Sequence, residues 1–530
     1  MNIGDILPTR EDLLDRPALS VEGVEPITYR ELVELRDAYA SALLASKVKP
    51  GDRVGVMLRN CVEYWAVHLA IGLVGAITVR INFRLSRDEL THVLNDSECT
   101  LLLIHDNVLA GLNARPEAAS LLNVVVLADD GVSHVPPWAV RAEGWLDVDR
   151  QHADLSIDRT QAPHMIMYTS GTTGKPKGAV WTHQSTAMFG LMQLMQWGTS
   201  PERVSMTVGP LYHVGSMEDL LLPTLMSGGH AVMMKSGHFS LRRALDLISS
   251  LRVTDALLFP AMIYELLERD DLGLIDFSSL KILLTGGSPL LQSAVNHLNQ
   301  SFPTVSLWSV YGLTEGGGIS CALSPEEGRF RPEAAGRPLP MVSLRIESDD
   351  GSETPLGQIG EICVRGPNAA VSYWNRDDES RATFVNGWVH TGDLGWLDEQ
   401  GLLTVRGRGK DMIRSGDENV YAAEVERVLA LHPSVVESAV IGVADRRFGE
   451  AVSAVIVVRA GETLTPTEVV EHCRAHLASY KTPRYIAFVE ELPRSATAKV
   501  LKQSIRDLIS GGHLTLVPTD SRANVNQQND

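Results

Sequence analysis

The stretch from Tyr168 to Gly178 holds the residues whose types and spacing point most directly to chemistry. Glycine lets a backbone approach a bulky anion, and successive backbone N–H groups can then line a concave anion site. Hydroxyl donors and lysines placed around such glycines suit a polyphosphate. The residues concerned are Thr169, Ser170, Gly171, Thr172, Thr173, Gly174, Lys175 and Lys177.

This segment lacks the G-x-x-x-x-G-K-[ST] spacing of a Walker A loop. The alternative interpretation is a polar surface linker, because clusters of Gly, Ser and Thr are usually loops. The motifs that follow along the chain favour the polyphosphate interpretation.

Further polar residues follow predicted strands, where ligands bind in open α/β sheets. His213 comes after a strand-like run at 205–208, and a structural role and a substrate-pocket role are equally open for it. Thr314 and Glu315 follow the run at 305–310. Because Mg²⁺ usually takes only one or two protein oxygens plus phosphates, these two residues could hold a nucleotide-bound cation. An exposed turn acid is the alternative for Glu315.

Two charged residues lie in glycine-rich segments nearer the C-terminus. Asp393 lies in a predicted turn flanked by glycines, where its carboxylate could accept hydrogen bonds from both hydroxyls of a ribose. Arg408 lies in the segment 407–413, which is short, charged and glycine-rich and is predicted to be an interdomain linker. The Arg408 guanidinium suits a ribose or a phosphate.

The composition limits the classes of function. The chain has 530 residues, of which 44% are hydrophobic and 21% charged, which predicts a soluble globular protein of two or more domains. The 47 basic and 65 acidic residues give a net charge of -18, which disfavours nucleic-acid and anionic-membrane binding. An anionic substrate must therefore be held by local cations.

The cysteines and the N-terminus predict a cytoplasmic protein. The five cysteines are scattered and form no C-x-x-C pair, so neither a zinc site nor a disulfide framework is expected. The first residues show no signal peptide, and no apolar run reaches the length of a membrane span, so no integral membrane part is expected.

Apolar periodicity predicts strands that alternate with helices, the pattern of an α/β fold with a largely parallel sheet. Thr28 and Glu31 have the spacing of a capping box, which predicts a helix from there to Leu43. The segment 51–57 is predicted to be a turn that leads into a strand. Further predicted strands are 76–79, 101–104, 123–127, 164–168, 256–259, 281–284, 436–443 and 452–458, and further predicted helices are 66–75, 88–94, 184–197, 422–431 and 466–477.

Taken in order, five motifs resemble those of the acyl-adenylate-forming superfamily, which includes acyl-CoA synthetases, firefly luciferase and the adenylation domains of nonribosomal peptide synthetases. They are the segments Thr169–Gly178, Tyr311–Glu315, Thr391–Asp393 and Gly407–Arg408, and a C-terminal lysine, Lys499. The resemblance extends from Ile27 to Lys502. It implies two half-reactions: a carboxylate and MgATP give acyl-AMP and pyrophosphate, and a thiol then displaces AMP.

The resemblance also implies a domain organisation. We expect a large N-terminal adenylation domain of layered α/β subdomains at residues 1–408, with the ATP and acyl sites. A small, mobile α+β C-terminal domain with the catalytic lysine is expected at 409–515, followed by a polar tail at 516–530. Lys410 matches the pivot about which the small domain turns.

Each nucleotide-binding motif receives a role from the resemblance. The loop from Thr169 to Lys177 is expected to hold the β- and γ-phosphates, and Glu315 and Thr169 the Mg²⁺, with Thr314 near the α-phosphate. Gly286, Gly287, Ser288 and Tyr311 are expected to frame the adenine, and Asp393 and Arg408 to hold the ribose. Lys499 would reach the carboxylate and the α-phosphate, where charge develops during transfer.

The acceptor and acyl sites follow from the branch of the superfamily. Peptide-synthetase domains carry an aspartate at the position of Ser240, so an amino-acid substrate is not expected. The segment Met412–Tyr421 resembles that of acyl-CoA ligases, in which an aromatic residue and cations contact the CoA nucleotide. Those residues would be Phe448, Tyr480, Lys481 and Arg484, and the acyl pocket would involve His213, Met217, Trp308 and Gly316 to Gly318. Because three successive glycines remove side chains from one wall, a roomy pocket for a fatty or bulky acyl group is predicted.

Three residues depart from the superfamily pattern: Ala498 stands in place of a glycine, Asp417 in place of a glycine, and Arg80 in place of a proline. Asp417 would add negative charge near the route of CoA, and Ala498 would restrict the backbone beside Lys499. Neutral drift is the alternative explanation for all three.

Three hypotheses for function follow. The favoured one is a complete acyl-CoA ligase that uses ATP, Mg²⁺ and CoA. The second is a member that performs one half-reaction, either thioester formation from a preformed acyl-AMP or adenylation with transfer to a carrier-protein thiol. The third is a non-catalytic binding protein. The acid itself and the oligomeric state, including a homodimer, stay open.

Overall fold

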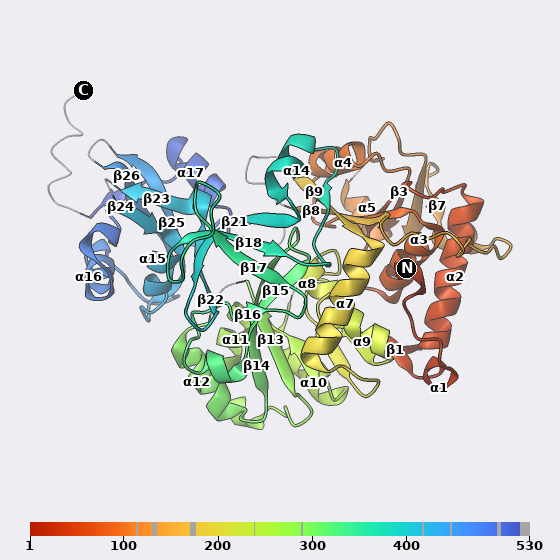
Figure 1. The fold of residues 1–530 in the computed structure, drawn as a ribbon, viewed down its shortest axis with the longest axis horizontal. Helices are drawn as coiled ribbons and strands as arrows, with labels where there is room; N and C mark the ends of the chain where they lie inside the picture. The colour runs from red at the N-terminus through yellow and green to blue at the C-terminus, as the bar shows by residue number, and fades with distance from the viewer. Residues whose placement is uncertain are drawn as a thin grey trace. The chain divides into compact units, whose positions relative to one another are not determined.

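The computed structural model describes residues 1–112, 115–129, 135–169, 176–237, 239–287, 290–415, 418–445, 448–494 and 500–519. The chain divides into two compact units. Unit 1 comprises Met1–Arg345, Cys363–Thr391 and Leu397–Thr404, and unit 2 comprises Ile346–Ile362, Gly392–Trp396 and Val405–Asp530. Both are built from helices and strands, which confirms the predicted α/β class (Figure 1). The predicted boundary after Arg408 stays a prediction.

The first sheet of unit 1 has eight strands, and its centre is parallel. In spatial order the strands are β19 (Ser372–Tyr373), β9 (Lys177–Thr182), β8 (Pro163–Thr169), β4 (Ile77–Arg80), β3 (Arg53–Met57), β5 (Leu101–His105), β6 (Asn123–Leu127) and β7 (Val140–Arg141). Because β4 and β8 are parallel neighbours, Arg80 and Thr169 both lie at the carboxyl ends of their strands, on the same side of the sheet. β9 returns antiparallel to β8, so the predicted anion loop joins the two strands of a hairpin.

The second sheet of unit 1 has nine strands and is also parallel at its centre. In spatial order they are β16 (Arg337–Pro338), β15 (Gly318–Leu323), β14 (Ser306–Leu313), β13 (Ile282–Gly286), β12 (Asp255–Leu257), β10 (Val204–Thr207), β11 (His230–Met233), β1 (Pro17–Val21) and β2 (Ile27–Thr28). β15 runs antiparallel to β14, so Thr314–Gly317 forms the turn of a second hairpin.

The helices of unit 1 begin and end close to the predicted positions, and the predicted capping box is confirmed. Thr28 Oγ1 accepts a hydrogen bond from Glu31 N (3.2 Å), and Glu31 Oε2 accepts one from Thr28 N (2.7 Å). The helices are α1 (Glu11–Leu14), α2 (Tyr29–Ala45), α3 (Val62–Val74), α4 (Arg87–Asp96), α5 (Asp106–Leu112), α6 (Ala142–Leu146), α7 (His183–Trp197), α8 (Val214–Met217), α9 (Leu221–Ser227), α10 (Leu241–Ser250), α11 (Pro260–Leu267), α12 (Gln292–Ser301), α13 (Pro325–Gly328) and α14 (Asp377–Thr383).

These helices and the two sheets form five layers. Side chains along a strand point alternately to opposite faces. Accordingly, Val54 joins the core under α2 and α3, whereas Leu102 joins the core under α4. Helix α7 lies between the sheets, because its Phe189 shares a core with Met165 of β8 and Leu284 of β13. Helices α10, α11 and α12 cover the far face of the second sheet.

Unit 2 is a six-stranded sheet with helices on both faces. The strands are β24 (Glu418–Tyr421), β23 (Met412–Ser415), β26 (Gly449–Val458), β27 (Tyr485–Val489) and β28 (Val517–Pro518), with β25 (Val435–Asp445) paired to β26. Helices α15 (Ala422–Leu429) and α16 (Pro466–His476) pack on one face, and α17 (Lys502–Ser510) packs on the other. A further five-stranded sheet consists of β17 (Ser343–Glu347), β18 (Gly360–Arg365), β20 (Phe384–Val385), β21 (Trp388–Leu397) and β22 (Leu403–Arg408). Strand β20 belongs to unit 1, and each of the other four strands contains residues assigned to both units.

One local prediction was wrong, and two further segments are more regular than predicted, although the interdomain role of 407–413 stays a prediction. Asp393 does not lie in a turn but inside β21, where Gly392 takes a positive φ of 70°. The predicted linker 407–413 is regular, because β22 continues through Arg408 and β23 begins at Met412 after a 3₁₀ turn. In the predicted tail, Val517 and Pro518 pair with β27. Within the described part of the chain no helix is long and apolar enough to cross a membrane.

Three histidines form a buried cluster in unit 1. The ring of His164 lies 5.4 Å from that of His68 and 5.1 Å from that of His183. Burial lowers the pKa of all three, to about 4 for His183. His183 is also fixed by a local contact, since its Nδ1 accepts a hydrogen bond from Ile3 N (3.0 Å). These rings are therefore neutral in the folded protein at neutral pH.

Folding stability should fall as the pH drops below the ordinary histidine pKa of 6.5. In this range the histidines of the unfolded chain are protonated, whereas the buried rings of the folded protein stay neutral. The free energy of unfolding therefore decreases between pH 6.5 and about 4. His183 alone should contribute on the order of 3 kcal/mol at the acid end of this range. The check is the thermal unfolding midpoint against pH for the wild type and for His183→Asn, which keeps an acceptor for Ile3 N. A variant profile as steep as that of the wild type would contradict this assignment.

Candidate active site

The turn between β14 and β15 is the most firmly held part of the candidate site in unit 1. Trp181 Nε1 donates to Thr314 O (3.1 Å), and Ala370 N donates to Glu315 O (3.0 Å). Asn368 Nδ2 donates to the next two carbonyls, those of Gly316 (3.2 Å) and Gly317 (2.9 Å). The backbone that carries Glu315 is thus fixed by two separate segments of the chain.

The Glu315 carboxylate is held by two hydroxyls through the same oxygen. Thr169 Oγ1, at the end of β8, donates to Glu315 Oε1 (3.1 Å), and the Tyr373 hydroxyl of β19 donates to the same atom (2.9 Å). Within the described part of the chain, Oε2 accepts no hydrogen bond. The sequence predicted Thr169 and Glu315 as a pair, and the structure brings them together.

Tyr373 was not predicted. It lies in a Ser-Tyr-Trp run without glycines, followed by a charged stretch at 376–381, and this local pattern does not connect it with Glu315. In the structure it borders an open pocket of about 370 Å³ that is also lined by Ser372, Trp374, Asn375, Asp377, Ser380 and Arg381. Tyr373 lies in β19, which pairs with β9, and its nearness to Glu315 follows from that pairing and not from the local sequence.

Of the predicted anion loop, Thr169 and Lys177 are described, and residues 170–175 lie outside the described residues. The Lys177 ammonium lies 5.4 Å from the centre of the Tyr373 ring and 3.9 Å from Glu379 Oε1. An ammonium above an aromatic face is attracted by the negative potential of the ring. Lys177 therefore lies beside the Thr169–Glu315–Tyr373 group, as expected of a residue of the same site.

The residues predicted to frame an adenine lie at the ends of neighbouring strands. Gly286 of β13 is the register partner of Val310 of β14, directly before Tyr311. A Cβ on Gly286 would come within 2.9 Å of Val310 O, so glycine is required for this close approach. Gly287 takes a positive φ of 91°, and Ser288 lies outside the described residues.

The residues predicted for an acyl pocket have different surroundings. His213 is the N-cap of α8, and its Nε2 is buried without a hydrogen-bond partner in the described chain. Burial, helped by Arg84 and Arg80, lowers the pKa of His213 to about 4, so the ring is neutral near pH 7. Met217 is fully buried in a core cluster, and the Trp308 ring packs against Trp197 at 5.0 Å.

The reason given for a roomy pocket was wrong. A Cβ on Gly317 would lie 2.2 Å from Asn368 O, and one on Gly318 would lie 2.5 Å from the Phe189 ring. A Cβ on Gly316 would lie 2.6 Å from Leu313 Cδ2. The glycines therefore allow close packing rather than leave open space, and a large acyl pocket stays a prediction.

Arg80, a departure from the superfamily pattern, is paired inside the protein. Its guanidinium donates to both carboxylate oxygens of Glu218, with Nη1–Oε2 at 2.7 Å, and both side chains are almost completely buried. Burial raises the pKa of Glu218, and Arg80 opposes that shift. Burial also raises the pKa of the adjacent Asp219. The pair ties the end of β4 to the residue that follows α8.

In unit 2, the two residues predicted to hold a ribose contact each other. Arg408 Nε lies 2.8 Å from Asp393 Oδ1, and the two residues come from the paired strands β22 and β21. Glu361 Oε1 accepts a hydrogen bond from Gly392 N (2.9 Å) next to Asp393. An arginine with its carboxylate partner offers both donors and acceptors to a polyol.

The residues predicted to contact a CoA nucleotide form two pairs in unit 2. The Arg484 guanidinium lies 3.8 Å from the centre of the Phe448 ring. Lys481 Nζ donates to both oxygens of Glu424 (2.8 and 2.9 Å) and lies 5.6 Å from the Tyr480 ring. Lys499, Ala498 and Asp417 lie outside the described residues, so their predicted roles stay predictions.

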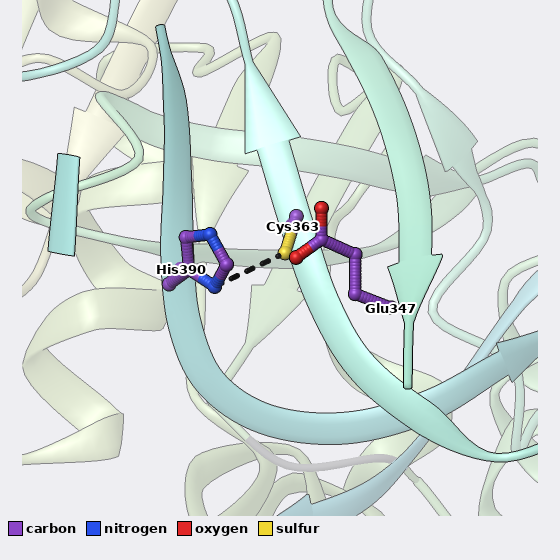
Figure 2. Close-up of side chains that lie close together, drawn as sticks. All are labelled: Glu347, Cys363 and His390. Carbon is purple, nitrogen blue, oxygen red and sulfur yellow. Dashed lines mark hydrogen bonds between the residues drawn. The ribbon is translucent and has the colours of Figure 1, made fainter. Parts of the chain in front are cut away.

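A thiol and an imidazole also lie together in unit 1. Cys363 Sγ of β18 is 3.6 Å from His390 Nδ1 of β21 (Figure 2). Figure 2 also labels Glu347, at the end of β17. This distance is that of a weak sulfur hydrogen bond between neighbouring strands, which stabilises the sheet locally.

Comparison with known proteins gives matches over most of the chain. The sequence profile described as "AMP-binding enzyme" matches residues 10–374, and the one described as "AMP-binding enzyme C-terminal domain" matches residues 424–499. The chain is 34% identical over 509 residues to the fatty acid–[acyl-carrier-protein] ligase ScoC of Streptomyces coeruleorubidus, covering 93% of this chain and 94% of the relative.

Two further matches involve CoA ligases. The indoleacetate–CoA ligase of Aromatoleum aromaticum is 34% identical over 491 residues, covering 91% of this chain and 93% of the relative. Among solved structures, the anthranilate CoA ligase AuaEII in complex with anthranoyl-AMP superimposes with a TM-score of 0.86 at 26% identity. That match covers 97% of this chain and 98% of the other.

Removing one partner of the Arg80–Glu218 pair should destabilise unit 1 strongly. Arg80→Met leaves a buried carboxyl without its partner, which typically costs about 3–5 kcal/mol. Arg80→Met combined with Glu218→Leu should recover most of that loss, because no uncompensated charge remains. Thermal unfolding of the single and double variants measures the difference. Equal losses in both variants would show that the ion pair does not carry the effect.

Proposed function

The chain belongs to the AMP-binding enzyme family, and from this we propose that it is an acid–CoA ligase for a bulky carboxylic acid. The resemblance to the acyl-CoA synthetase branch of the acyl-adenylate-forming superfamily is confirmed, as is the predicted activity of an ATP-dependent, AMP-forming ligase. Such an enzyme activates an acid as acyl-AMP and transfers the acyl group to CoA.

The meeting of Thr169 and Glu315 is the observation that carries the proposal for this chain. These residues are 146 positions apart in sequence and come from different sheets, yet the Thr169 hydroxyl donates to the Glu315 carboxylate. Two motifs that the superfamily uses for phosphates and metal thus lie in one place, with Lys177 beside them. A carboxylate substrate and ATP are both anionic and repel each other. Their reaction therefore requires nearby hydrogen-bond donors and cations, such as these hydroxyl and ammonium groups.

The chemistry of these residues fits a magnesium site. Carboxylate and hydroxyl oxygens are the protein ligands that Mg²⁺ prefers, and it usually needs only one or two of them beside phosphate oxygens. Glu315 Oε2 and the Thr169 hydroxyl would supply them. The bound ion would neutralise charge on the phosphates of the nucleotide.

The other proposed nucleotide-binding residues are assigned for each unit separately. In unit 1, we assign the adenine to Gly286, Gly287 and Tyr311, and the β- and γ-phosphates to the loop that ends at Lys177. In unit 2, Asp393 and Arg408 would hold the ribose through their paired donors and acceptors. Lys499 would stabilise the charge that develops between the carboxylate and the α-phosphate.

The class of acid is inferred from the relatives. The related CoA ligases are named for indoleacetate and anthranilate, which are aromatic, whereas the Streptomyces relative is named for a fatty acid. Since His213 is neutral and its Nε2 atom is buried without a partner in the described chain, it can offer one hydrogen bond to the acyl group but no charge. These facts favour an aromatic or long-chain acid over acetate or propionate.

A carrier-protein thiol is the alternative acceptor. The Streptomyces relative is named for an acyl carrier protein. In addition, Lys481, one of the cations proposed for the CoA phosphates, is already paired with Glu424. CoA would have to share or displace that carboxylate.

The cytoplasmic location stays a proposal, and the five cysteines, all in the described residues, form no disulfide.

ATP–pyrophosphate exchange with a panel of acids, beside CoA consumption from synthetic acyl-AMP, tests the proposed function. A complete ligase should give acid-dependent exchange with aromatic or long-chain acids and should also form thioester. Exchange without thioester would select the carrier-protein alternative, and thioester without exchange would select the half-reaction enzyme. Absence of both would contradict the proposal.

Lys499→Ala should separate the two steps. Loss of a group that stabilises developing charge typically lowers a rate about 10²–10³-fold, so acid-dependent exchange should fall by that factor. Thioester formation from preformed acyl-AMP should stay within a few-fold of wild type. Lys502→Ala, which removes a C-terminal lysine whose Nζ forms a partly buried ion pair with Glu426 (2.8 Å), is the matched control and should change neither rate. Thermal unfolding of this variant shows whether loss of the ion pair costs stability. An equal loss of both half-reactions in Lys499→Ala would contradict the assignment.

A further inference from the structure

Tyr373 makes the most direct unexplained contact at the candidate site. Its hydroxyl donates to Glu315 Oε1 at 2.9 Å, slightly closer than the Thr169 hydroxyl at 3.1 Å. Both hydroxyls meet one carboxylate oxygen, and the other oxygen, Oε2, accepts no hydrogen bond within the described part of the chain. The carboxylate therefore has one anchored side and one side that is available to a cation.

The position of the phenol is set by its backbone. Tyr373 lies in β19, where it is the register partner of Ala179 of β9, and Trp374 N donates to Gly178 O (2.8 Å). Ser380 Oγ, from α14, accepts a hydrogen bond from Tyr373 N (2.9 Å) and donates its own hydrogen to Arg376 O (2.5 Å). The backbone of this tyrosine is thus held from two sides, and its hydroxyl reaches Glu315 as a fixed donor.

The ring of Tyr373 has contacts of its own. Its face lies 5.4 Å from the Lys177 ammonium, and its edge packs against Phe384 with the ring centres 5.4 Å apart. A phenylalanine at this position would keep both ring contacts and remove only the hydroxyl. The role of the hydroxyl can therefore be tested without disturbing the packing.

We propose that Tyr373 is a positioning residue for the metal–nucleotide step: together with Thr169 it fixes Glu315 so that Oε2 is presented to the cation of the bound nucleotide. The proposal rests on the proposed function and extends it to a residue outside the five motifs. A carboxylate can turn about its last torsion, whose preference is broad. Anchoring Oε1 removes that freedom before the nucleotide arrives, so less ordering remains for the binding step.

The primary test compares Tyr373→Phe with a matched control in the full-length protein. Tyr168→Phe is the control, because the Tyr168 hydroxyl also donates to a carboxylate, Asp96 Oδ2 (2.8 Å), but not to Glu315. The probe is Mn²⁺ with α,β-methylene-ATP, since Mn²⁺ shares the oxygen-ligand preference of Mg²⁺. Its binding is followed by electron paramagnetic resonance.

Tyr373→Phe should weaken binding of Mn²⁺ in the nucleotide complex about tenfold, the usual effect of losing a hydrogen bond to a charged group. It should raise the KM for MgATP in pyrophosphate exchange by a similar factor, and change the KM for the acid little. Tyr168→Phe should leave both values near those of wild type. If Tyr373→Phe matches wild type, or if both variants lose binding equally, the proposal is overturned.

A double-mutant cycle tests whether Tyr373 acts through Glu315. Tyr373→Phe should change Mn²⁺ binding less in a Glu315→Gln background than in wild type, because the carboxylate that it positions is gone. An undiminished effect would show that the tyrosine acts by another route and would overturn the proposal. Wild type that binds Mn²⁺ and the nucleotide but exchanges no pyrophosphate with any acid would contradict the proposed function while leaving this inference intact. Thermal unfolding of each variant identifies losses that arise from misfolding.

Discussion

The Glu315 carboxylate, anchored through one oxygen, is the interaction on which the candidate site depends. Thr169 ends a strand of the first sheet and Glu315 follows a strand of the second, so their hydrogen bond joins the two sheets at the carboxyl ends of their strands. Each of these strands pairs with the antiparallel strand that follows it in the chain, β8 with β9 and β14 with β15. The five-layered architecture of unit 1 is what brings those hairpins to the same place.

The same architecture explains why buried polar groups collect around the site. Where two sheets converge on one helix layer, side chains such as Arg80, Glu218 and His164 lose contact with water. Each then needs a partner or has to stay neutral, because an unpaired buried charge is costly. Arg80 and Glu218 satisfy each other, whereas the histidines stay neutral through a lowered pKa. A departure from the superfamily pattern at Arg80 is thus accommodated by a partner 138 positions away.

The sequence predicted most helices and strands correctly, but it predicted only some of the contacts between them. Strands such as 123–127 and the capped helix after Thr28 follow from local periodicity and hydrogen bonding, which a single sequence displays. Asp393 was placed in a turn because of its glycines, but Gly392 takes its positive φ inside a strand. The Gly316–Gly318 run was interpreted as open space, although Asn368 and Phe189 fill that space. Tyr373 had no local signal at all, because its role depends on pairing across the fold.

The central claim is that Glu315 presents its unanchored oxygen to the cation of a bound nucleotide. A crystal structure of the full chain with Mg²⁺ and α,β-methylene-ATP tests this most directly. The account predicts that Glu315 Oε2 lies about 2.1 Å from the metal, or is joined to it by one water, while Oε1 keeps its bonds to Thr169 and Tyr373. A metal held by other carboxylates, with Glu315 turned away and those two bonds broken, would contradict it.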